Sequence, residues 1–116
     1  MEQSKNMARI AVTALEDKKA DDVCILDISM VSIIADYFII ADGNSQNQVQ
    51  AMIDNVEEAL GKEGYSPKQI EGYATANWVL MDYGNIIIHV FDKENRIFYD
   101  LERIWRDGRR ITKEEL

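Results

Sequence analysis

The stretch that decides the fold spans residues 76–91 and reads ANWVLMDYGNIIIHVF. Two apolar runs flank a short Asp-Tyr-Gly-Asn segment, a pattern that is typical of a β-hairpin. Gly84 supplies the positive φ angle that a tight turn needs, and the loop is either Tyr83-Gly84 or Gly84-Asn85. The sequence therefore predicts two neighbouring antiparallel strands around this turn.

The two faces of the predicted hairpin differ in chemistry, because side chains alternate along a strand. One face is wholly apolar and is expected to face the core; it comprises Val79, Met81, Ile86, Ile88 and Val90. The other face mixes large apolar groups with an acid and an imidazole; it comprises Trp78, Leu80, Asp82, Ile87, His89 and Phe91. A mixed face is costly to bury without polar partners and adhesive when exposed, so we expect another molecule to cover it.

Periodicity elsewhere in the chain predicts the remaining elements. They are a helix over about residues 4–18, strands over 23–28 and 37–41, a helix over 45–60, and a helix over 97–105 that follows the hairpin. Ser4 is a suitable N-cap for the first helix, and Ser45 with Gln48 forms a capping box at the second. The connection between the first two strands contains apolar residues.

This order of elements predicts an α/β fold, in which one small domain holds a mixed β-sheet flanked by helices. The 45–60 helix is long enough for a right-handed crossover between parallel strands, and the hairpin adds an antiparallel pair. The domain is expected to span residues 1–116, with a core over about 7–105 and a charged tail, 106–116, that frays.

Composition narrows the class of function. The chain has 116 residues with a net charge of −8, and it contains one Cys and one His. An acidic chain repels phosphate, which argues against nucleic-acid binding by the protein alone and favours a partner with a basic surface. The lone Cys24 excludes a disulfide framework and favours the cytoplasm, as do the absence of a bilayer-spanning apolar run and of a signal-peptide core.

The candidate chemical groups do not assemble into a catalytic pattern. His89 has no identifiable nucleophile, because the chain lacks a nucleophile elbow and Cys24 is expected to be buried. Gly43-Asn44-Ser45 opens a helix after a strand but lacks the longer glycine pattern and the lysine of a phosphate-binding loop. With no Asp-x-Asp pair for magnesium and too few ligands for zinc, no metal or cofactor is expected.

The large polar-tipped side chains have two interpretations each. A packed or hydrogen-bonded His89 is the default, and an interface histidine is the alternative. Trp78 and Trp105 are either core residues or anchors for a partner, since tryptophan is common in both settings.

Short motifs spread from about Met7 to Trp105 form a specific combination. They are Asp27-Ile28-Ser29, Ser32, Asp36-Tyr37-Phe38, Gly43-Asn44-Ser45, Gln48-Val49, Glu71-Gly72, Trp78, Asp82-Tyr83-Gly84, His89-Val90-Phe91, Arg96, Tyr99, Leu101-Glu102 and Trp105. Together they resemble the ribosome silencing factor family, also called RsfS, Iojap or YbeB. Asp42 departs from the family pattern, which usually has Thr or Ser there, and the tail after Trp105 lies outside it.

The resemblance implies a nucleotidyltransferase-like topology without the catalytic acids. It also implies a non-catalytic function: binding protein fourteen of the large ribosomal subunit, blocking the small subunit sterically and so repressing translation. Family members are often homodimers when free. The residues expected to bind the partner are Trp78, Asp82, Tyr83, His89, Glu102 and Trp105.

Two rival hypotheses remain open at this point. One is a degenerate nucleotidyltransferase-like enzyme that still binds a nucleotide at Gly43-Asn44-Ser45. The other is that the mixed hairpin face is only a contact between two copies of the chain.

Overall fold

The computed structural model of the chain describes residues 2–93 and 108–116. Its elements are α1 (Glu2–Asp17), β1 (Asp21–Asp27), β2 (Tyr37–Gly43), α2 (Gln46–Lys62), β3 (Gln69–Glu71), β4 (Trp78–Asp82), β5 (Ile86–Asp92), β6 (Arg109–Ile111) and the short 3-10 helix η1 (Lys113–Glu115). The predicted α/β class and the hairpin are confirmed, and so are two of the predicted helices and two further strands. The helix expected over 97–105 lies outside the described residues.

The strands form one mixed sheet in the order β3-β4-β5-β2-β1-β6. Neighbouring strands are antiparallel except β2 and β5, which run parallel with Ile39 opposite Ile88. The crossover from β2 passes through α2, β3 and β4 before the chain enters β5. The parallel partner of β2 is therefore the second strand of the hairpin.

The sequence patterns miss two short edge strands. β3 pairs with β4, where Ile70 lies opposite Met81, and β6 pairs with β1, where Ile111 lies opposite Ile25. The expectation that the tail frays is wrong for residues 109–111, because Ile111 is buried in the core and its strand is hydrogen-bonded to β1. One apolar side chain and a free sheet edge hold this otherwise charged segment.

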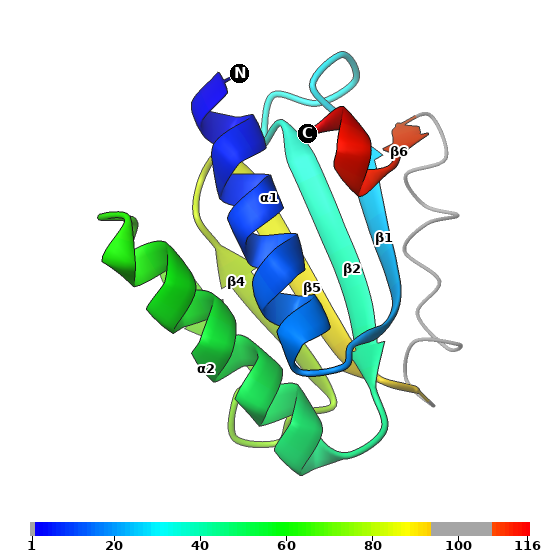
Figure 1. Ribbon diagram of the computed structural model, residues 1–116, viewed down its shortest axis with the longest axis vertical. Helices are drawn as coiled ribbons and strands as arrows, with labels where there is room; N and C mark the ends of the chain where they lie inside the picture. Colours follow the sequence, from blue (N-terminus) through cyan, green and yellow to red (C-terminus); the bar gives the residue numbers. More distant parts are fainter. Residues whose placement is uncertain (1, 94–107) are drawn as a thin grey trace.

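Helices α1 and α2 lie side by side and cover one face of the sheet (Figure 1). The predicted apolar face of the hairpin packs beneath them: Val79, Met81, Ile86, Ile88 and Val90 are all fully buried. Burying a side chain of this size contributes roughly 1.5–3 kcal/mol, so this layer stabilises the packing of the helices on the sheet. None of the described helices is long and apolar enough to cross a lipid bilayer.

The first helix starts earlier than its sequence pattern suggests. It begins at Glu2, so Ser4 lies inside the first turn and does not cap it. The Ser4 hydroxyl instead donates a hydrogen bond to Oδ2 of Asp36 at 2.5 Å. This contact ties the start of α1 to the segment that leads into β2.

The opposite face of the sheet carries a second apolar cluster. We call its central part the aromatic face; it comprises Phe38, Trp78, Leu80, Ile87, His89 and Phe91. Its β4 and β5 members share a face as predicted, because Trp78 lies opposite Phe91 and Leu80 lies opposite His89.

Candidate functional site

The turn of the hairpin sets the register of the aromatic face. The amide of Tyr83 donates to the carbonyl of Ile86 at 3.0 Å, so the loop consists of Gly84 and Asn85. Gly84 has a φ of +85°, which a glycine adopts without strain. Of the two loops that the sequence allows, the structure selects Gly84-Asn85.

Trp78 is positioned from three sides. Its ring stacks on Phe91 with centroids 5.3 Å apart, and its indole Nε1 donates to Nδ1 of His89 at 3.1 Å. Behind it, Gly72 has a φ of +83°, and a side chain there would collide with the carbonyl oxygen of Trp78. The indole remains half-buried, so it is held in place while part of it stays accessible.

His89 is buried in the aromatic face, as the default interpretation of a packed, hydrogen-bonded histidine predicts. It is 5% exposed and makes an edge contact with the ring of Phe38 at 5.1 Å. Because Nδ1 accepts the indole hydrogen bond, the proton of the neutral ring sits on Nε2. Nε2 has no hydrogen-bond partner in the described structure, and burial lowers the pKa of His89 to about 4.

A neutral, buried histidine of this kind suits packing better than catalysis. A general base must reach the proton that it removes, whereas the contacts of His89 described here are aromatic rings and an indole. The default interpretation of a packed, hydrogen-bonded histidine is therefore the one that the geometry favours. His89 orients Trp78 through the hydrogen bond that its Nδ1 accepts.

Asp82 and Tyr83 point to opposite sides of the sheet. Asp82 is half-buried at the end of β4, on the side of Trp78, and its Oδ1 accepts from the amide of Gly84 at 2.8 Å. Tyr83 is buried in the core beneath the helices, where burial and the charge of Glu57 raise its pKa to about 12. The expectation that Tyr83 lies near Trp78 is wrong, because adjacent residues of an extended chain alternate between faces.

The structure thus brings only part of the predicted site together. Trp78 and His89 touch, and Asp82 lies on the same face at the other end of β4. Glu102 and Trp105 lie outside the described residues. Among the predicted site residues that the structure describes, Trp78 and Asp82 are the two that are half-buried and so partly accessible.

The predicted nucleotide-binding alternative centres on the start of α2. Ser45 is its N-cap and accepts from the amide of Gln48 at 3.1 Å, while Oε1 of Gln48 accepts from the amide of Asn44 at 2.6 Å. The amides of Asn44 and Gln48 are therefore already satisfied. Gln48 accepts from the amide before the N-cap and not from that of Ser45, so only the Ser45 half of the predicted capping box is present. A hollow of about 340 Å³ nearby is lined by Asn44, Ser45, Gln46, Asp92 and Lys93.

Metal-binding clusters are a separate question from the helix cap. Among residues 2–93 and 108–116, no three His, Cys, Asp or Glu side chains converge to hold a metal ion.

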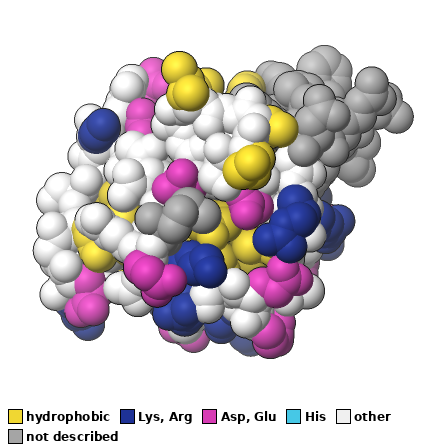
Figure 2. Space-filling view, turned by 90° about the horizontal axis from the view of Figure 1, so that it is seen from above, with side chains coloured by type: hydrophobic (Ala, Val, Ile, Leu, Met, Phe, Trp, Pro, Cys, Tyr) yellow, Lys and Arg dark blue, Asp and Glu magenta, His cyan; other side chains and the backbone are white. Residues whose placement is uncertain are grey.

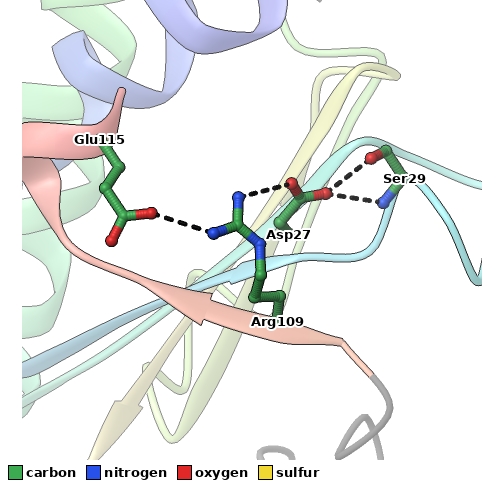
Figure 3. Close-up of polar contacts among 4 residues, drawn as sticks. All are labelled: Asp27, Ser29, Arg109 and Glu115. Atoms are coloured by element: carbon green, nitrogen blue, oxygen red, sulfur yellow. Dashed lines mark hydrogen bonds and ion pairs between the residues drawn. The ribbon is translucent and has the colours of Figure 1, made fainter.

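Sequence reasoning missed a polar network at the end of β1 (Figure 3). Asp27 accepts from the amide and hydroxyl of Ser29 at 3.0 and 2.6 Å, and it pairs with Arg109 of β6 at 3.6 Å. Arg109 also pairs with Glu115 at 3.1 Å. Burial alone would raise the pKa of Asp27, but the Ser29 hydrogen bonds and the Arg109 charge outweigh it and lower the pKa.

A second missed feature is the connection between β1 and β2. It carries four apolar side chains that stand out into solvent, namely Met30, Val31, Ile33 and Ile34. Figure 2 looks onto the end of the molecule that carries this connection and shows separate hydrophobic side chains among polar and acidic groups. The apolar content of this connection is visible in the sequence, since five of the seven residues from 28 to 34 are apolar. Their exposure follows from the structure, in which the connection is not a strand.

Comparison with known proteins gives a consistent result. The family model described as "Ribosomal silencing factor during starvation" matches residues 1–116. The ribosomal silencing factor RsfS of Bacillus subtilis is 42% identical over 104 residues, covering 90% of this chain and 88% of that protein.

Two crystal structures are similar over most of the chain. A protein from Bacillus halodurans has a TM-score of 0.83 at 37% identity, covering 92% of this chain and 97% of its own. A protein from Chromobacterium violaceum has a TM-score of 0.85 at 33% identity, covering 92% of this chain and 88% of its own.

Proposed function

Since the chain belongs to the family of ribosomal silencing factors, we propose that it binds protein fourteen of the large ribosomal subunit and blocks joining of the small subunit. The family match over residues 1–116 is the observation that carries this proposal. Translation is repressed because a bound factor occupies space that the small subunit needs. The mechanism requires no chemical step and no cofactor.

The chemistry of the surface supports this kind of contact. Trp78 offers a partly accessible, rigidly held aromatic side chain, which is the commonest type of anchor in protein interfaces. Asp82 and the net charge of −8 favour a basic surface on the partner. We further propose that the free protein forms a homodimer, which would compete with the ribosome if both used this face.

Sedimentation with purified large subunits tests the proposal. Trp78→Ala should abolish co-sedimentation, because it removes the anchor, provided that circular dichroism shows the variant folded. Asp82→Asn should weaken binding by roughly three- to tenfold, as expected for loss of one charge at an interface. This second change keeps an oxygen to accept the Gly84 amide, so the turn is preserved.

A matched control removes a charge elsewhere. The control is Glu58→Gln, because Glu58 lies on the exposed surface of α2. Among the ion pairs described, Glu58 pairs only with Lys62, at 3.5 Å. It should bind like the wild type. Wild-type protein that neither co-sediments with large subunits nor hinders their joining to small subunits would refute the proposed function.

A further inference from the structure

The β1–β2 connection holds four apolar side chains in solvent. Met30 is 93% exposed, Ile34 is 60% exposed and Val31 is 48% exposed, while Ile33 is as exposed as in an extended chain. Single exposed apolar residues are ordinary, but four of them within five positions gather at one end of the molecule, and we call this group the apolar patch.

The backbone of the connection is organised, so the exposure of these side chains is built into the fold. The amides of Val31 and Ser32 donate to the carbonyl of Ile28 at 3.1 and 2.9 Å. The amide of Ile34 donates to the Ser32 hydroxyl at 3.0 Å. These local bonds form a compact turn that directs its apolar side chains outward.

The base of the connection is also anchored to the sheet. Ile28 and Ala35, at its two ends, are buried members of the second apolar cluster together with Ile87. The amide of Asp36 donates to the carbonyl of Asn85 at 2.8 Å, next to the hairpin turn. The patch is therefore continuous with the aromatic face at the end where Asp82 lies opposite Ile87.

Charges around the patch indicate what kind of surface can cover it. Asp27 and Asp36 lie just outside the two ends of the connection, and Asp82 lies beside the hairpin turn, where Lys68 is also close. Arg109 is already paired with both Asp27 and Glu115. An anionic lipid surface would repel this end of the molecule. A second copy of the chain that docked here through the same end would place like carboxylates against one another.

We propose that residues 30–34 are the apolar anchor of the large-subunit interface, inserting into a hollow on a basic protein of that subunit beside Asp82. This inference rests on the proposed function and extends its site from β4 to the β1–β2 connection. Acidic groups steer the approach, and the four side chains supply the apolar area that the half-buried Trp78 alone does not.

Quantitative binding to purified large subunits tests this inference. The double variant Met30→Ser with Ile33→Ser should raise the Kd at least about tenfold, because two exposed side chains lose their apolar contact. Its thermal unfolding should match that of the wild type, since neither side chain is buried. Tyr73→Ser, another exposed hydrophobic residue on a separate segment before β4, should change the Kd by less than about twofold.

A photo-crosslinking amino acid placed at position 33 identifies the occupant directly. It should crosslink to a basic large-subunit protein, whereas the same group at position 73 should not. Crosslinks to ribosomal RNA would overturn the inference. So would a double variant that binds as tightly as the wild type.

The remaining outcomes separate this inference from its premise and from other occupants. If the wild type binds large subunits and the double variant binds equally well, the proposed function stands and the anchor assignment fails. If the double variant loses only self-association in analytical ultracentrifugation, the patch is a dimer contact. Flotation of the wild type but not the variant with anionic phospholipid vesicles would make it a membrane contact, which also overturns the inference.

Discussion

At the scale of single residues, His89 and Trp78 act as one unit. The imidazole accepts the indole hydrogen bond with Nδ1 and stays neutral because it is buried. The tryptophan is therefore held at the edge of the aromatic face by a neutral hydrogen-bond acceptor. Loss of either side chain is expected to disturb the orientation of the other.

The buried state of His89 makes stability depend on pH. Burial lowers its pKa from the ordinary value of 6.5 to about 4 in the folded chain, while the unfolded chain keeps the ordinary value. As the pH falls below 6.5, His89 binds a proton in the unfolded state but not in the folded state. The free energy of unfolding therefore decreases until about pH 4. The loss should total roughly 3 kcal/mol, which urea unfolding at a series of pH values would measure.

His89→Gln is the matched variant for this prediction. Its amide oxygen can accept the indole hydrogen bond, but it does not titrate. The variant should lack the decline between pH 6.5 and pH 4, even if it is less stable overall. Asp27 contributes in a lower window, below its ordinary pKa of 3.8, because its folded pKa is lowered. Equal slopes for variant and wild type above pH 4 would contradict the assignment.

Residue types account for some of the site and not for the rest. Alternation along β4 and β5 correctly places Trp78, Asp82 and His89 on one face. Whether such a face is open is a property of everything packed around it, and so the burial of His89 could not be read from the hairpin alone. Tyr83 could have been placed correctly, because the same alternation directs it to the other face of the sheet from Asp82.

At the scale of elements, the hairpin and the two helices are consistent with their local patterns. The edge strand β6 is different, because its three residues read Arg-Arg-Ile and carry no alternating apolar pattern. It forms because Ile111 reaches the core and β1 offers a free edge. Its ion pair from Arg109 to Asp27 also fixes the base of the β1–β2 connection.

The role of β6 can be tested with two neighbouring substitutions. Ile111→Ala should lower the free energy of unfolding by roughly 2–4 kcal/mol, because it leaves a cavity in the core. Arg110→Ala, on the exposed side of the same strand, should change it by less than about 0.5 kcal/mol. Chemical denaturation measures both values. Two equally small effects would mean that this strand does not pack as described.

At the scale of the whole molecule, charge and apolar surface contribute differently to binding. The net charge of −8 acts over a distance and is screened by salt, whereas apolar contact is not. Raising monovalent salt from about 50 to about 300 mM at constant magnesium should weaken wild-type binding to large subunits by roughly fivefold or more, as screening shortens the Debye length.

Two variants separate these contributions in the same assay. The ratio of wild-type to Asp82→Asn affinity should shrink toward one at high salt. The ratio of wild-type to Met30→Ser/Ile33→Ser affinity should stay constant. If the affinity ratio for Met30→Ser/Ile33→Ser falls with salt as steeply as the ratio for Asp82→Asn, the binding contributions of the two sites do not differ in chemistry as described.

The sequence by itself determined the α/β class, the core face of the hairpin and the N-cap at Ser45, because each depends on residues close together in the chain or on their local alternation. It also carried the family resemblance, because short motifs can be read along the whole chain without knowing how they pack. Only the tertiary structure decided that β5 pairs with β2, that residues 109–111 join the sheet and that His89 is enclosed while residues 30–34 are not. These outcomes depend on contacts between segments far apart in the chain, where burial is set by what packs against a residue and not by its immediate neighbours.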